Sequence, residues 1–197
     1  MRNRDENKAT TIKEKALEMV VKEGFDGFSM QKLAKKVKVS PATIYIYFKD
    51  KEDLILQLYK EENEKMAEET LKNFRPDMSF SEGLKVQWIN RSRYCMENKA
   101  QMVFLEQIRH SSLQKKASTL LSSEFRAIMQ DFVTNAIKNK QLIKVPVEVF
   151  WSVAFAPLYT LVRFHGTGTS IGGREFTFSE EIMFKTLEIV LKGLKPE

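Results

Sequence analysis

Two short helical patterns separated by only two residues constrain the fold of this 197-residue chain more than any other feature. The first follows Ser29, a good helix N-cap residue, and its apolar side chains fall at the i, i+3, i+4 and i+7 positions of one helix face: Met30, Leu33, Ala34 and Val37. After Lys38 and Val39, Ser40 can cap a second helix, and Pro41 occupies its first position, where a missing N–H costs nothing. Two short helices joined by so tight a turn predict a helix-turn-helix unit.

Helices are predicted on both sides of this pair. The stripe formed by Ile12, Ala16, Met19 and Val20 predicts a first helix that stops at Gly24. The short helix from Pro41 should end near Phe48. Asp50 can then cap a fourth helix, with Asp53 placed as in a capping box, and we expect this helix to run to about Asn73. The first 54 residues are therefore expected to form a three-helix domain.

The short helix from Pro41 should present an outward face that suits DNA, because the second helix of a helix-turn-helix enters the major groove by its amino end. Ile44 and Phe48 are four residues apart and should face inward onto Leu33 and Val37. The residues left facing outward are Ala42, Thr43, Tyr45 and Tyr47. Tyr and Thr hydroxyls can reach phosphates, and small side chains can touch thymine methyl groups. Lys51, at the start of the fourth helix, can hold a phosphate beside free helix N–H groups.

The charge distribution favours the same partner. Residues 1–51 carry 12 Lys and Arg against 7 Asp and Glu, which places +5 of the formal net charge of +6 at the amino end. The alternative is that Tyr45, Tyr47 and Phe48 are core aromatics and that Lys49 and Lys51 belong to a solvated surface. The order and spacing of the whole set favour DNA.

The segment "FSMQKLAKKVKVSPATIYIYFKDKEDLI" resembles the DNA-binding signature of the TetR family of bacterial repressors, and the resemblance spans about residues 10–56. Its tyrosine, its aromatic two positions later and its lysine past the turn match Tyr45, Tyr47 and Lys51. By position the resemblance also nominates DNA-contacting residues on the two helices of the motif: Gln31, Pro41, Ala42 and Thr43, with the capping Ser40 beside them. The chain departs from the family by lacking a glycine before the threonine and by carrying Ile46 in place of a histidine or aromatic, which leaves the operator sequence open.

From residue 55 onward the sequence predicts further helices. The expected ranges are roughly 79–98, the segment "AQMVFLEQIRH", 116–140, 146–165 and 179–194, with "GTGTSIGGREF" as a loop before the last. The predicted fold class is all-α: the helix-turn-helix domain over residues 1–54, followed by a larger helical domain over 55–197. The resemblance implies that this second domain binds a ligand and dimerises.

A homodimer through roughly 146–165 and 179–194 is implied by the resemblance and has some independent support. Large apolar side chains surround the first of these helices on nearly all sides: Phe150, Trp151, Phe155, Tyr159, Leu161 and Val162. One face can then meet the protein's own core while another needs a partner, although a central helix of a monomer is the alternative. Two recognition helices about 34–36 Å apart would read a palindromic operator.

The resemblance also implies a small-molecule effector that releases the DNA, and repression as the outcome. The middle helices are rich in Met and aromatic residues, which suit an apolar ligand. The simple alternative is that these residues form the core. The candidate ligand-binding residues are Trp88, Tyr94, Met96, Phe104, Gln107, Phe125, Met129, Trp151 and Phe155. An architectural DNA-binding protein without an effector is the rival function, and the size of the carboxy-terminal part favours a sensor.

Enzyme activity is not expected. His110, His165 and Cys95 are the only histidines and the only cysteine, too few for a histidine or zinc cluster, so no metal and no cofactor are predicted. "GTGTSIGG" follows no predicted strand and lacks the Lys-Ser/Thr of a phosphate loop. The single cysteine and the polar amino terminus predict a cytoplasmic protein with no membrane contact.

Overall fold

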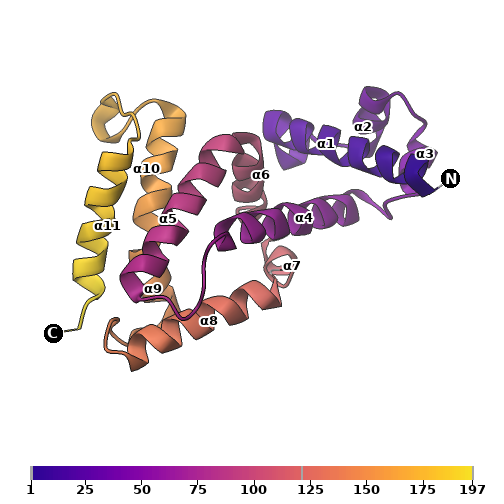
Figure 1. The fold of residues 1–197 in the computed structure, drawn as a ribbon. Helices are drawn as coiled ribbons and strands as arrows, with labels where there is room; N and C mark the ends of the chain where they lie inside the picture. Colours follow the sequence, from indigo (N-terminus) through magenta and orange to yellow (C-terminus); the bar gives the residue numbers. More distant parts are fainter. Residues whose placement is uncertain (1, 121, 197) are drawn as a thin grey trace. The chain divides into compact units, whose positions relative to one another are not determined.

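The computed structural model describes residues 2–120 and 122–196 (Figure 1). Within these residues the secondary structure is helical, and the pairing of extended backbone is limited to one isolated antiparallel bridge between Thr169 and Glu175. The predicted all-α class is therefore confirmed. The chain divides into two compact units, one formed by Met1–Lys65 with Asn98–Leu121, the other by Met66–Glu97 with Ser122–Glu197. The expected functional boundary after residue 54 does not coincide with this division and stays a prediction.

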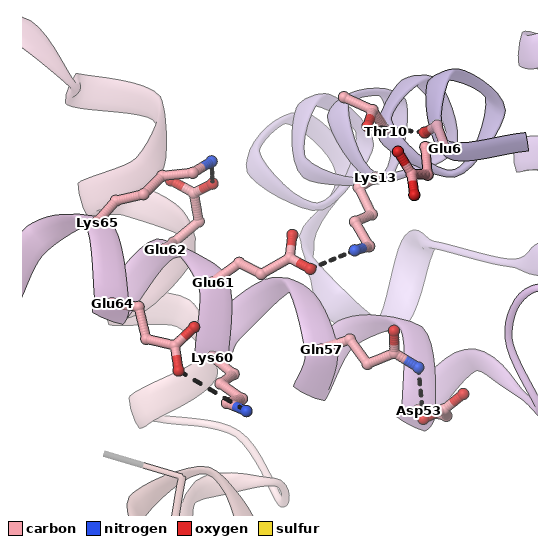
Figure 2. Close-up of polar contacts among 10 residues, drawn as sticks. All are labelled: Glu6, Thr10, Lys13, Asp53, Gln57, Lys60, Glu61, Glu62, Glu64 and Lys65. Carbon is pink, nitrogen blue, oxygen red and sulfur yellow. Dashed lines mark hydrogen bonds and ion pairs between the residues drawn. The ribbon is translucent and has the colours of Figure 1, made fainter. Parts of the chain in front are cut away.

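The first unit contains the helix-turn-helix and two later helices. Its elements are α1 (Arg2–Gly27), α2 (Met30–Val37), α3 (Pro41–Tyr45), the amino-terminal part of α4 (Lys51–Leu71), α6 (Lys99–Arg109) and α7 (Gln114–Ser118). α1 packs against α2 and, more extensively, against α6. Lys13 of α1 forms an ion pair with Glu61 of α4 (Figure 2), and Lys116 of α7 forms one with Glu52 at the start of α4. α4 is thus fixed to helices that lie before and after it in the sequence.

Local hydrogen bonds explain where these helices begin and end. α1 loses helical geometry at Gly24, whose φ of 74° favours glycine. The backbone N–H of Thr43 donates to Ser40 Oγ at 3.2 Å, and that of Asp53 donates to Asp50 Oδ1 at 2.8 Å. Asp53 in turn accepts from the N–H of Lys49 at 2.9 Å, a reciprocal arrangement close to a capping box. Ser29 caps α2 in the same way by accepting from Lys32 N–H at 3.3 Å.

α3 is shorter than the sequence indicated, since it ends at Tyr45 and not near Phe48. The N–H groups of Tyr47 and Phe48 both donate to the carbonyl of Ile44 at 3.0 Å, so the chain closes into a turn at that carbonyl. Both inward-facing residues, Ile44 and Phe48, are nonetheless fully buried as predicted.

The second unit is built around α5 (Phe80–Glu97). α10 (Ala156–Thr167) and α11 (Glu180–Leu194) pack side by side on it, with α9 (Val147–Ala154) and α8 (Ser123–Lys138) completing the core (Figure 1). Fully buried Trp88 of α5 donates its indole N–H to the carbonyl of Ala154 at 2.8 Å, which fixes α5 to the junction of α9 and α10. The short 3-10 helix η1 (Ile171–Gly173) lies in the predicted loop before α11.

Two of the expected long helices are interrupted. The range 116–140 contains the end of α7 and then α8, because Ser122 caps a new helix by accepting from Phe125 N–H at 3.2 Å; residue 121 lies outside the described residues. The range 146–165 is bent by 41° between α9 and α10. Pro157 lacks the N–H that would reach back four residues, so a straight helix cannot continue through it.

Of the helices among residues 2–120 and 122–196, none is by itself long and apolar enough to cross a membrane; the bent pair α9 and α10 reaches that level only when the two are taken together.

Candidate nucleic-acid interface and interior site

The outward face of α3 carries the exposed side chains predicted for DNA contact. Tyr45 is 49% exposed, and Pro41 and Ala42 at the amino end of the helix are exposed too. Ile44 is turned inward and packs in the core of the unit. The structure thus leaves the first turn of α3 open, which is the part of a recognition helix that reaches base edges.

Thr43 and Tyr47 are half-buried, whereas Ser40 is exposed. The hydroxyls of Ser40 and Thr43 lie 2.9 Å apart and share a hydrogen bond, so part of the polar capacity of Thr43 is used within the cap. Tyr47 is half-buried, and its ring centroid lies 6.4 Å from that of Phe48. Gln31, on the first turn of α2, is exposed.

Lys51 has a structural contact that the sequence did not indicate. Its Nζ donates to the carbonyl oxygen of Phe25 at 2.7 Å and lies 4.1 Å from the centroid of the Phe25 ring. The ammonium group therefore joins the start of α4 to the end of α1. An ammonium has three N–H donors, so this contact leaves donors for a phosphate, and that role stays a prediction.

The other lysines of the helix-turn-helix fall into two groups, those that form an ion pair with a carboxylate and those that do not. Lys32 pairs with Glu23 at 3.1 Å and Lys36 with Glu18 at 3.2 Å. The hydrogen bond from Lys15, and then that from Lys36, lower the pKa of the Glu18 carboxyl. Within the described part of the chain, three exposed lysines near the motif have no carboxylate at ion-pair distance: Lys35, Lys38 and Lys49. Uncompensated positive charge beside an open recognition helix attracts phosphates.

Ile46 also belongs to this face, although in the sequence it stands out only as a departure from the family pattern. It is 78% exposed and follows Tyr45 directly after α3. A large apolar side chain so exposed between two tyrosines can contact a thymine methyl group or the sugar edge of a groove. The sequence signal for its exposure is that Ile46 lies off the helix face marked by the buried residues Ile44 and Phe48.

The candidate ligand residues fall into both compact units. Trp88, Met129 and Phe155 belong to the core of the second unit, where half-buried Phe125 packs against them. Trp151 lies at the edge of the same group, 40% exposed, with its ring centroid 4.6 Å from that of Phe155.

The other candidates are placed differently. Tyr94 is buried and Met96 half-buried on the second half of α5. Phe104 and Gln107 lie on α6 in the first unit, where Gln107 lines a surface hollow with Phe25 and His110. The predicted set therefore does not form a single cluster within either unit.

Arg91, which was not predicted, is the polar centre of the aromatic group in the second unit. It is only 2% exposed, and its guanidinium lies over the rings of Phe155, Trp151 and Phe125 at 4.4, 5.2 and 5.7 Å from their centroids. Arg91 lies among polar residues in the middle of α5, with Arg93 two positions later, and the sequence gave no sign that it would be buried.

Cys95, one turn further along α5, is buried as well. Burial raises the pKa of its thiol to about 11, and the nearby Arg91 charge only partly opposes this effect. A thiol with so high a pKa is a poor nucleophile. Among the described residues there is also no group of three or more His, Cys, Asp or Glu side chains arranged to hold a metal ion.

Comparisons with known proteins agree with the geometry of the first unit. A family model described as "Bacterial regulatory proteins, tetR family" matches residues 12–58, a range that contains every residue predicted to contact DNA. The crystal structure of a TetR family transcription regulator from Marinobacter aquaeolei VT8 covers 100% of both chains with a TM-score of 0.74 and 26% sequence identity. Residues 12–58 thus match the TetR family model, and the whole chain resembles a TetR family transcription regulator in fold.

Two curated relatives match part of the chain. It is 41% identical over 46 residues to the "Fatty acid metabolism regulator protein" of Bacillus subtilis (strain 168), covering 23% of this chain and 24% of that protein. It is 32% identical over 80 residues to an "Uncharacterized HTH-type transcriptional regulator" of Haemophilus influenzae, covering 41% of this chain and 43% of that protein. The chain is thus matched over less than half the length of either relative.

Proposed function

We propose that this protein is a transcriptional repressor of the TetR family that binds a palindromic operator as a homodimer and releases it when a small, largely apolar ligand binds. The observation that carries the proposal is the open face of α3, where Pro41, Ala42, Tyr45 and Ile46 are exposed on a well-capped helix-turn-helix. Tyr45 and Ile46 contact base edges and thymine methyl groups. Gln31, Tyr47 and Lys51 contact the sugar-phosphate backbone of the DNA.

The dimer interface in this proposal is the outer face of α9, α10 and α11, within roughly 146–165 and 179–194. Three large aliphatic side chains on these helices are exposed: Val147, Val149 and Ile189. Phe155, in contrast, is fully buried within its own unit and takes no part in this face. Exposed apolar side chains on α9 and α11 support a protein interface on this side of the unit.

Continuity of the chain provides a route from ligand to DNA. α5, which carries Arg91 and Trp88, leads after Glu97 directly into α6, and α6 packs against α1 of the helix-turn-helix. A ligand that shifts the end of α5 therefore acts on the element that supports α1. Release follows if the shifted state no longer presents the two recognition helices at the operator spacing.

The first experiment selects bound duplexes from a random DNA pool with the purified protein, at low and at raised salt. An enriched palindrome that survives raised salt supports the proposal. Sequence-blind binding that disappears with salt would instead support an architectural DNA-binding protein, and an absence of binding would refute DNA as the partner.

The role of Lys51 is tested with the selected operator. Lys51→Ala should weaken binding to every sequence alike and lower the slope of log K against log salt by about 1. Lys138→Ala, an exposed lysine of the second unit, is the charge-matched control and should leave the slope unchanged. If Lys51→Ala lowers only the melting temperature and not the slope, the lysine serves the Phe25 contact alone.

The dimer is tested by sedimentation of two single variants. Ile189→Glu places a charge on the proposed interface and should yield monomers. Ile171→Glu makes the same change at a side chain that is 80% exposed in the loop before α11 and should remain dimeric. Two variants that both sediment as dimers would place the interface elsewhere.

A further inference from the structure

The buried guanidinium of Arg91 has no counter-charge within the described chain. Arginine keeps its proton in proteins, so this side chain is a permanent cation at 2% exposure. None of the ion pairs formed between described residues includes Arg91. A buried charge without an opposite charge is costly, and such groups in proteins normally pair or serve a function.

Hydrogen bonds hold the guanidinium in one orientation and leave one end open. Its Nε donates to Gln87 Oε1 at 3.1 Å, and one terminal nitrogen donates to the Tyr159 hydroxyl at 2.7 Å. Gln87 is itself fixed, because its amide N–H donates to the Thr70 carbonyl at 2.8 Å. The second terminal nitrogen, Nη2, is buried and has no hydrogen-bond partner among the described residues. Two N–H donors are thus held in place without an acceptor.

The surroundings of the open donors are aromatic. Phe125, Trp151 and Phe155 face the cation, and within the described chain Arg91 is the one cation positioned over these three rings. The electron-rich ring faces compensate the charge in part, but they do not accept the in-plane N–H bonds of Nη2. Trp151 is 40% exposed and Phe125 is half-buried, so the aromatic group reaches the surface of the unit.

We propose that Arg91 is the receptor for the carboxylate of an effector that carries an apolar body. A carboxylate accepts two parallel N–H bonds from a guanidinium, and the Tyr159 and Gln87 contacts hold Arg91 ready for it. The apolar body packs on Trp151, Phe125 and Phe155. A single cation at the site suits a monoanionic carboxylate better than a multiply charged phosphate ester.

This inference rests on the proposed function in assuming that the effector enters the second unit, and its test separates the two. Binding is measured by calorimetry and by fluorescence of the two tryptophans, Trp88 and Trp151, with two pairs of probes: octanoate with 1-octanol, and 2-naphthoate with 2-naphthol. Each acid should bind wild-type protein about tenfold or more tightly than its alcohol, because a charge-assisted hydrogen bond contributes at least that ratio.

The variants Arg91→Met and Arg91→Lys assign the effect to the guanidinium. Arg91→Met should lose the preference for the acids by about tenfold or more and should bind the alcohols as wild type does. Arg91→Lys keeps the charge without the planar fork and should retain part of the preference. A cooperative melting transition shows that each variant is folded, and the comparison of acid with alcohol in wild type does not depend on any variant.

The inference is overturned if the acids bind wild type no better than the alcohols, or if folded Arg91→Met keeps the preference. If the alcohols release operator DNA and the acids bind no better than the alcohols, the proposed apolar effector is supported and the proposed carboxylate group is refuted. Acids that bind through Arg91 without releasing DNA would keep this site and contradict its regulatory use.

Discussion

Replacing Gly83 by alanine should destabilise the protein although alanine is the better helix former. A Cβ at Gly83 in α5 would lie 2.4 Å from Cε2 and 2.6 Å from Cζ of Phe132, and 3.2 Å from Cε2 of Phe74. Ordinary contacts begin near 3.4 Å, so the Phe132 ring must move by about 1 Å. That ring is fully buried and packs against Phe74 and Phe80, with centroids 5.0 and 5.8 Å apart, and has little room to move.

The expected magnitude is the difference between two opposing effects. Overpacking a core costs about 1–3 kcal/mol, and the blocked ring places Gly83→Ala at the upper end. Alanine in place of glycine inside a helix returns about 1 kcal/mol. The net loss is about 2 kcal/mol, which for a chain of this size lowers the melting temperature by about 4–8 °C.

The assay is thermal unfolding at one fixed protomer concentration, since association changes apparent stability. Gly166→Ala in α10 is the matched control, because a Cβ there meets no atom within 4 Å, and it should raise the melting temperature slightly. Phe132→Leu removes the clashing ring atoms, so the double variant with Gly83→Ala should lose less than the sum of the single losses. If Gly83→Ala stabilises the protein as Gly166→Ala does, close packing at Gly83 is refuted.

Three further predictions concern single side chains. At pH 8 the native Cys95 thiol should react with a maleimide or disulfide reagent at least about 100-fold more slowly than the unfolded chain. The reason is that a pKa of about 11 in place of 9.0 lowers the thiolate fraction by that factor. An equal rate would show that the thiol is not buried. Asp50→Ala should lower the free energy of unfolding in urea by about 1 kcal/mol, because the hydrogen bond from Asp53 N–H is lost. Asp50→Asn should keep most of this stability, and equal losses for both variants would exclude the cap as the cause. Phe155→Ala should cost about 3–5 kcal/mol in the same assay, because the ring is fully buried against Trp151 and Phe150, and a cost below 1 kcal/mol would contradict the packing.

The helix-turn-helix was predictable because its determinants are local. Caps at Ser29, Ser40 and Asp50 act within three or four residues, and the inward face of Ile44 and Phe48 follows from helical spacing. The same locality explains the error at the end of α3. Hydrophobic spacing alone does not show that two N–H groups converge on the Ile44 carbonyl and close a turn there.

The helices of the larger domain were predicted from the sequence, but the way in which they pack together was not. The apolar stripe from 146 to 165 concealed the bend at Pro157, and the assignment of α6 to the same compact unit as α1 depends on contacts between residues far apart in the chain. The Met and aromatic set was therefore divided between two units, although each member separately is a reasonable core residue.

The sequence by itself determined the all-α class, the capped helix-turn-helix and its exposed tyrosine, since these depend on interactions between near neighbours. Only the tertiary structure decided the environment of Arg91 and of Lys51. Arg91 meets Tyr159 from 68 residues away, and Lys51 meets the Phe25 carbonyl from 26 residues away. A buried cation is defined by what surrounds it, and those surroundings exist only after α5, α8, α9 and α10 have packed together.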